Sequence, residues 1–197
     1  MLLYDSRVSG NCYKVRLLLA RLGLDYERRE LDVVDRSNRK DVLGDLNPGL
    51  RVPTLVLDDG RPLGESGAIL WYLADGTELV PEDAYERAQV LQWMFFEQYS
   101  HEPYVAVARF WLTKGIEVEP ETLAERQRVG HLALDAMERH LAGRSYLVGE
   151  RCSIADIALY AYTHVADEGG FDLAPYTAVN AWLDRVAAQP GHVTIDA

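Results

Sequence analysis

The sequence has 197 residues, enough for one large domain or two small ones. Apolar residues make up 48% of the chain and charged residues 26%, a composition that suits a packed core with a charged surface. The formal net charge of −11 argues against nucleic acid or an anionic membrane surface as a partner.

The negative charge is concentrated in the later part of the chain. Residues 1–76 contain 11 Lys and Arg against 12 Asp and Glu, whereas the remaining residues contain 9 against 19. An anionic small ligand would therefore meet less repulsion in the first part of the chain.

Two cysteines, Cys12 and Cys152, stand in unrelated contexts. They form neither a disulfide framework nor a zinc-ligand set, so we expect no metal. The chain has no N-terminal stretch with the basic and apolar regions of a signal peptide, and no apolar run of about 18 residues. We therefore expect a cytoplasmic protein with no membrane partner.

Residues 1–76 alternate strand-like and helix-like segments. Leu2 to Tyr4 predicts a buried strand, and the leucine-rich segment after it predicts a helix that ends near Gly23. The stretch "YERREL", residues 26–31, predicts a second strand. The two strands and the helix between them are typical of a βαβ unit.

Turn signals organise the rest of this part. "NPG" at residues 47–49 predicts a turn, and Asp59-Gly60 predicts the tip of a hairpin that begins with the strand 54–57. The stretch "SGAILWYLA" then predicts a helix with Ser66 as its N-cap. The sequence thus indicates an α/β domain over residues 1–76.

A linker at residues 77–85 precedes a part that is helical throughout, residues 86–197. The helical pattern of residues 84–114 is rich in aromatic residues and is interrupted by Pro103. Ser153 and Asp156 stand at the spacing of a capping box before an apolar run, which indicates a local stabilising device.

Four stretches carry a family resemblance: "SGNCYKVRLLL", "NPGLRVPTLVL", "GESGAILWYL" and "SIADIALY". In this order and spacing the chain resembles the cytosolic glutathione transferases over nearly its whole length. The resemblance implies a thioredoxin-like domain that binds glutathione, followed by an all-helical domain that carries a hydrophobic co-substrate site. It also implies a homodimer and a cis peptide bond before Pro53.

The resemblance also implies how glutathione is held. The N–H and C=O of Val52, next to Pro53, would pair with the cysteinyl backbone of glutathione like an added strand. Ser66, at a helix start, suits the γ-glutamyl carboxylate, and Glu65 suits the γ-glutamyl ammonium. The family often places donors for the glycyl carboxylate where this chain has Asn38, Arg39, Lys40 and Arg51.

A glutathione transferase has to keep the thiol of glutathione ionised near neutral pH. One or two hydrogen-bond donors at a helix start can stabilise that thiolate. Ser9 matches the position of the catalytic serine in serine-type members and is the first candidate. Asn11 matches the Asn donor of some bacterial members of disulfide-reductase type and is the second. Cys12 lies on an apolar helix face, so we predict that it packs and does not react.

The co-substrate pocket is expected in the aromatic helical stretch that follows the linker. Tyr104, His101 and Arg109 are its candidate residues. The neighbouring aromatic residues Tyr99, Phe110 and Trp111 would line the same pocket or a dimer contact.

Three functions remain open at this point. The first is a glutathione transferase that attacks hydrophobic electrophiles in a detoxification reaction. The second, favoured by Asn11, is a glutathione-dependent disulfide reductase or peroxidase on the same fold. The third is a non-catalytic binding module, against which the presence of Ser9, Pro53, Glu65 and Ser66 argues.

Overall fold

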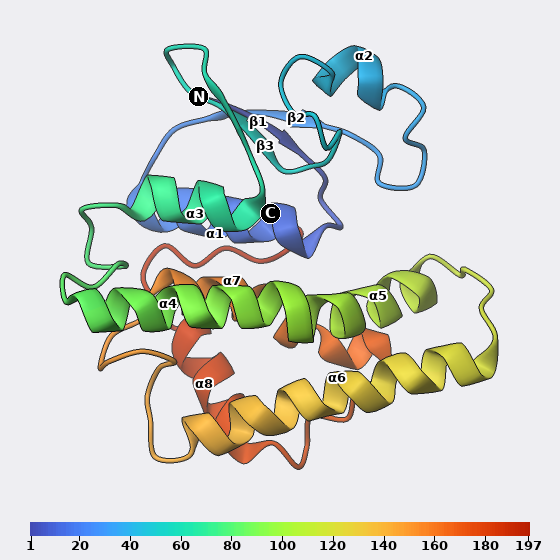
Figure 1. Cartoon of the computed structure of the whole chain (residues 1–197), viewed down its shortest axis with the longest axis vertical. Coiled ribbons are helices and arrows are strands. Elements are labelled where there is room, and N and C mark those ends of the chain that lie inside the picture. The colour runs from blue at the N-terminus through green and yellow to red at the C-terminus, as the bar shows by residue number, and fades with distance from the viewer. The chain divides into compact units, whose positions relative to one another are not determined.

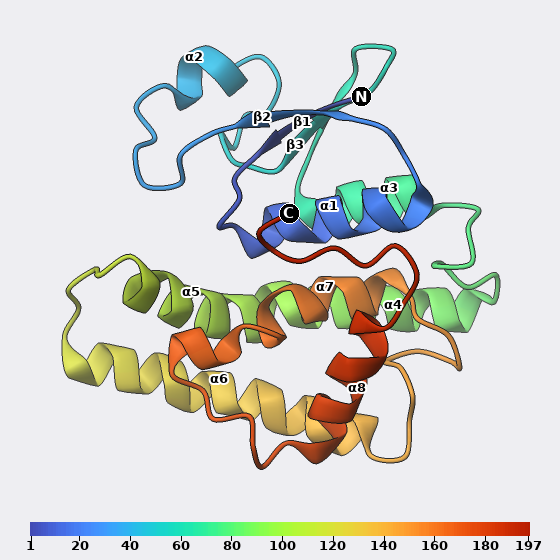
Figure 2. The same cartoon turned by 180° about the vertical axis from the view of Figure 1, so that it is seen from behind.

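The computed structural model describes all residues, 1–197, and divides into two compact units. The first unit comprises Met1–Thr77 together with Pro190–Ala197, and the second comprises Glu78–Gln189. Each unit can be followed in Figures 1 and 2. None of the helices combines the length and the apolar character that crossing a membrane requires.

The first unit is a four-stranded mixed sheet with helices on both faces. Its elements are β1 (Leu2–Asp5), α1 (Gly10–Leu22), β2 (Glu27–Glu30), α2 (Arg39–Leu43), β3 (Thr54–Val56), β4 (Pro62–Gly64) and α3 (Ser66–Ala74). The strand order is β2-β1-β3-β4, with β1 parallel to β2 and antiparallel to β3. The βαβ unit and the hairpin predicted from the sequence are confirmed, and with them the thioredoxin-like architecture.

Alternation along β1 separates two apolar layers. Leu3 points into a cluster with Val15 and Leu19 of α1 and Ile69 of α3, and all four are fully buried. Tyr4 points to the opposite face, where it packs in a cluster with Leu31 and Leu43. Figure 1 shows the matching arrangement, with α1 and α3 side by side on one face of the sheet and α2 on the other.

Both ends of α1 are set by local chemistry. Ser9 is the N-cap, and its side chain accepts a hydrogen bond from the N–H of Cys12. Gly23 ends the helix with φ 63°, a left-handed conformation that glycine adopts at little cost.

The start of α3 differs from the prediction by one residue. Ser66 is the first helical residue, and Glu65 is the N-cap, with a φ of 63° and no side-chain capping bond. A positive φ in a residue with a Cβ is uncommon and is often found where the backbone is shaped for function. The Ser66 N–H consequently lies in the first turn of α3, at the positive end of the helix dipole.

The last eight residues, which the sequence analysis includes in the helical part, group with the first unit in the structure. The hydroxyl of Tyr13 donates to the carbonyl of Val193 at 2.7 Å, and Arg16 donates to the carbonyl of Ile195 at 2.5 Å. Figure 2 shows this terminal segment running alongside α1. Sequence periodicity gave no signal for it, because these contacts use backbone carbonyls.

The second unit is helical. Its elements are α4 (Ala84–Phe96), the π-helical turn η1 (Glu97–His101), α5 (Glu102–Thr113), α6 (Pro120–Leu141), α7 (Ile154–Thr163), the 3₁₀ turn η2 (Ala166–Gly169) and α8 (Thr177–Ala187). The aromatic stretch predicted over residues 84–114 is therefore helical in two α-helices joined by η1, and Pro103 lies in the first turn of the second one.

Helix α7 lies at the centre of the second unit, and all ten of its residues are buried. The predicted capping box is present at its start, where a side-chain oxygen of Asp156 accepts from the Ser153 N–H at 2.8 Å. The other oxygen accepts from the Leu147 N–H at 3.0 Å and from the Trp182 indole N–H at 2.9 Å. Asp156 thus joins α7 to a loop and to α8, which is more than the local role that its spacing predicts.

Candidate functional site

The loop between β1 and α1 brings the candidate donors to one helix start. The N–H of Ser9 donates to the carbonyl of Ser6 at 3.0 Å, which closes the loop just before the helix. The Ser9 oxygen accepts the Cys12 N–H at 3.3 Å. An accepting hydroxyl still has its own proton to donate, so Ser9 can offer that proton to an anion at the positive end of α1.

Asn11 lies in the first turn of α1 and is partly exposed. Its side-chain oxygen accepts the Lys14 ammonium at 2.7 Å and the Ser66 hydroxyl at 3.2 Å. The first turns of α1 and α3 are therefore joined by a direct side-chain contact. The predicted thiol site and the predicted γ-glutamyl site meet at this contact.

Cys12 is fully buried. Burial raises the pKa of its thiol, and the negative charge of Asp5 acts in the same direction. A thiol that resists ionisation is a poor nucleophile, which agrees with the packing role predicted from the helix face. Cys152 is also buried and lies in the second unit.

A buried ionic cluster holds the loop between β1 and α1 in place. Arg16 contacts both carboxylate oxygens of Asp5, at 2.7 and 3.0 Å, and Arg28 forms a further ion pair with Asp5. Arg16 also donates to the loop carbonyls of Ser6 at 3.4 Å and Arg7 at 3.2 Å. The loop that carries Ser9 is thereby tied to β1 and α1.

The segment before β3 contains the cis peptide bond that the resemblance implies. The Val52–Pro53 peptide bond is cis, and Pro53 is buried. The N–H and C=O of Val52 have no hydrogen-bond partner within the chain. Glu65 is exposed and Ser66 is buried, so a ligand in contact with both would touch the surface beside the start of α3.

The four candidate donors for a glycyl carboxylate differ in exposure. Asn38, Lys40 and Arg51 are exposed, whereas Arg39 is 3% exposed. Arg39 donates to the carbonyl of Asp32 at 2.5 Å, and its Nε and Nη1 are buried without a partner. Burial lowers the pKa of Arg39. The exposed side chains are the ones that can reach a ligand without a rearrangement of the loop.

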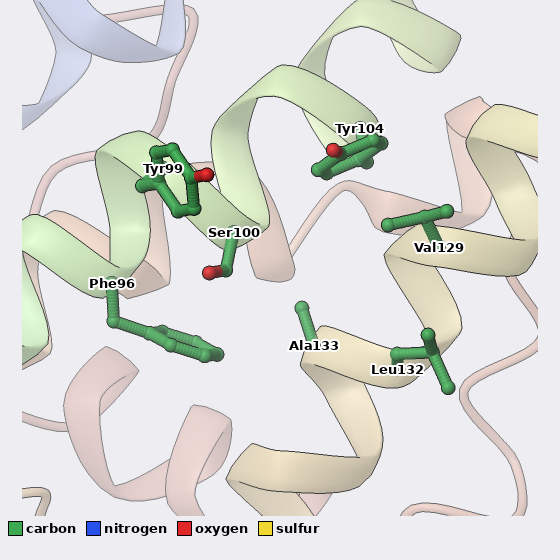
Figure 3. Close-up of a pocket in the computed structure, with 7 residues that line it drawn as sticks. All are labelled: Phe96, Tyr99, Ser100, Tyr104, Val129, Leu132 and Ala133. Atoms are coloured by element: carbon green, nitrogen blue, oxygen red, sulfur yellow. The ribbon is translucent and has the colours of Figure 1, made fainter.

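The second unit contains a cavity of about 260 Å³ between the α4–η1–α5 stretch and α6. Figure 3 shows its lining residues, which are Phe96, Tyr99, Ser100, Tyr104, Val129, Leu132 and Ala133. Of the three predicted co-substrate residues, only Tyr104 lines it. His101 is fully buried with its Nε2 3.0 Å from the Thr163 hydroxyl, and Arg109 pairs with Glu168 at 2.7 Å.

Lys14 contacts the candidate residue Asn11, and this neighbour was not identified from the sequence. Lys14 is 1% exposed, although lysines are almost never fully buried without a partner. A signal was present in the sequence, because Lys14 follows Asn11 at the i,i+3 spacing that places two side chains on one helix face.

The described chain contains no group of three or more His, Cys, Asp or Glu arranged to hold a metal ion.

Two family profiles match the chain. "Glutathione S-transferase, N-terminal domain" matches residues 8–75, and "Glutathione S-transferase, C-terminal domain" matches residues 92–190. The chain belongs to the glutathione S-transferase family. The resemblance to this family, and the thioredoxin-like and helical units that it implies, are confirmed.

Similar proteins point to more than one activity within this glutathione S-transferase family. The chain is 50% identical to a glutathione S-transferase from Pseudomonas fluorescens, with a TM-score of 0.95 and 98% of each chain covered. It is 30% identical to the disulfide-bond oxidoreductase YfcG of Escherichia coli, covering 91% of this chain and 87% of YfcG. It is also similar to the chain of Ure2p solved with S-hexylglutathione, at 25% identity and a TM-score of 0.87, over 96% of this chain and 95% of that chain.

Proposed function

We propose that this protein is a glutathione transferase that stabilises the glutathione thiolate for attack on hydrophobic electrophiles. The observation that carries the proposal is the contact between Asn11 and Ser66, which joins the start of α1, capped by Ser9, to the start of α3. Two side-chain hydrogen-bond donors at the positive end of a helix dipole can stabilise a thiolate and so lower the pKa of the thiol. A cytoplasmic detoxification reaction is the biological setting that we propose for it.

In this proposal Ser9 is the main donor to the thiolate and Asn11 is the second. The first turn of α3 receives the γ-glutamyl group, with Ser66 on its carboxylate and Glu65 on its ammonium. The free N–H and C=O of Val52 pair with the cysteinyl backbone of glutathione. Catalysis then follows from the lowered thiol pKa and from holding two substrates together.

Lys40 and Arg51 are proposed to hold the glycyl carboxylate. Both side chains are exposed. Replacing each with Met should raise the Kd for glutathione while leaving the pKa of the bound thiol unchanged. Equal glutathione affinity in both variants and in the wild type would remove these two residues from the site.

The test of the main proposal measures binding first and activity second. Retention on immobilised glutathione is expected, together with the ultraviolet absorbance of a thiolate when glutathione is added near pH 7. A chloronitrobenzene electrophile should then be conjugated. Failure to bind glutathione overturns the proposal, whereas binding without turnover of any substrate supports a non-catalytic binding module.

A glutathione-dependent disulfide reductase or peroxidase is the second candidate function. It is supported by Asn11 in the first turn of α1 and by the similarity to a disulfide-bond oxidoreductase. Assays with a mixed disulfide of glutathione and with an organic peroxide distinguish it from a transferase. If kcat/KM is higher on those substrates than on electrophiles, the second candidate replaces the first.

A homodimer is also proposed, with a second copy covering the face around the cavity. Large apolar side chains are exposed there: Phe95 at 68%, Tyr99 at 84% and Leu132 at 54%. Leu132→Glu should convert a dimer into a monomer in sedimentation or light scattering. If the variant stays dimeric but loses kcat/KM for apolar electrophiles, the cavity with Tyr104 is instead the co-substrate site.

A further inference from the structure

Lys14 has no place in the mechanism proposed so far, yet its side chain is 1% exposed. Burying an ammonium is unfavourable unless the protein supplies hydrogen-bond acceptors. One acceptor is the side-chain oxygen of Asn11, 2.7 Å from Lys14 Nζ. The buried charge thus lies one hydrogen bond away from a residue proposed to touch the thiolate.

This contact decides which way round the Asn11 carboxamide sits. An ammonium can only donate hydrogen bonds, so the atom that faces Lys14 must be the acceptor Oδ1 and not Nδ2. The Ser66 hydroxyl also contacts Oδ1, at 3.2 Å. The amide N–H groups therefore lie on the opposite branch of the carboxamide.

We propose that Lys14 is a positioning residue, which holds Asn11 so that its amide N–H donates to the glutathione thiolate. The inference rests on the proposed function, because the thiolate is its object. The ammonium also withdraws electron density through Oδ1, which strengthens the N–H groups as donors. Through Ser66 the same carboxamide is coupled to the γ-glutamyl end of the ligand.

Other charged groups of the first unit lie near the starts of α1 and α3. Asp5 is the nearby acid that acts on Cys12, and it is paired with Arg16 and Arg28. Arg39 is 3% exposed, and its Nη2 donates to the Asp32 carbonyl. The starting turn of α3 carries no charged residue except its N-cap, Glu65, which is exposed.

The experiment measures the pKa of the glutathione thiol bound to Lys14→Met, from the thiolate absorbance as a function of pH. We expect that pKa to rise by about one unit, with a roughly tenfold loss of thiolate wherever the solution pH lies below it. In an Asn11→Ala background, Lys14→Met should have almost no further effect, because the two residues act in series. Lys114→Met, which removes an exposed lysine, is the matched control and should leave the thiol pKa unchanged.

A folded Lys14→Met that binds glutathione with the wild-type thiol pKa overturns the inference, as do additive effects in the Asn11→Ala background. If Lys14→Met fails to fold, Lys14→Gln is measured instead, with the same expected rise and the same overturning result. A crystal structure of the wild-type protein with glutathione supplies a test without substitution. The inference is also overturned if the Asn11 amide nitrogen lies beyond hydrogen-bond distance of the sulfur.

Failure of the proposed function and failure of the role of Lys14 give different experimental results. If the wild-type protein does not bind glutathione, the proposed function is wrong. If the wild-type protein binds glutathione as a thiolate and Lys14→Met does the same, only the role of Lys14 is wrong.

Discussion

The side-chain oxygen of Ser9 accepts a hydrogen bond from the N–H of Cys12 at 3.3 Å. This relationship gives the two residues opposite roles. Ser9 has an acceptor position occupied by the helix and a proton left to donate, whereas the Cys12 thiol is packed away from solvent. The serine is therefore the residue equipped to meet a ligand thiolate.

Ser9→Ala should raise the pKa of the bound glutathione thiol by about one to two units, since a hydrogen bond to a charged group contributes about 1.5–3 kcal/mol. A higher thiol pKa means less thiolate at neutral pH, so the conjugation rate at pH 7 should fall and recover as the pH rises. The pH–rate profile is the measurement. Asn11→Ala should show a smaller shift, and the opposite order would reverse the ranking of the two donors.

Ser9→Ala also removes an N-cap, which should lower the free energy of unfolding by about 1 kcal/mol. Asp83→Ala is the control for this effect, because Asp83 caps α4 by accepting the Tyr85 and Glu86 N–H groups at 3.0 Å each. It should lower stability and leave the thiol pKa unchanged.

Cys12 should be inert in the native protein. Burial raises the pKa of its thiol, so the thiolate that reacts with a disulfide reagent is nearly absent at neutral pH. A thiol titration should detect both cysteines only after unfolding. Cys12→Ala should keep the thiol pKa of bound glutathione, and a complete loss of activity in a folded Cys12→Ala protein would contradict the packing role.

Arg16→Met should destabilise the protein by about 3 kcal/mol or more, because it leaves part of a buried ion cluster without its partner. Arg16 and Asp5 have side-chain exposures of 2% and 0%, and the arginine also holds the Ile195 carbonyl. Urea unfolding is the measurement. Arg128→Met, which breaks an exposed pair with Glu125, is the control and should have a far smaller effect.

Asp156→Ala should lower the free energy of unfolding by more than about 3 kcal/mol, since it leaves several buried donors without an acceptor. Ser153→Ala removes the hydroxyl that donates to the Asp156 carboxylate at 2.9 Å and accepts the Asp156 N–H in the capping box, and it should lower the free energy of unfolding by about 1 kcal/mol. Equal losses in the two variants would show that Asp156 acts only as a local cap. Asp172→Ala, at an exposed turn where Asp172 accepts the Ala174 N–H, is the control.

Local patterns predicted most of the elements correctly. The βαβ unit, the hairpin and the capping box of α7 all rest on contacts between residues close in sequence or on simple periodicity. The co-substrate residues could not be predicted from the sequence, because an aromatic helix offers several faces and periodicity does not show which face is covered. In the structure His101 lies in the core, and Arg109 forms an ion pair with Glu168.

The sequence by itself determined the two kinds of unit and the loop that carries Ser9 and Asn11, because these follow from turn residues and apolar pattern, and its motifs carried the resemblance to the family. The tertiary structure alone decided that the Ser66 hydroxyl contacts the side-chain oxygen of Asn11 from 55 positions away. It also decided that the last residues pair with Tyr13 and Arg16. These contacts join segments distant in sequence or use backbone carbonyls, whose partners are set only when the chain has folded.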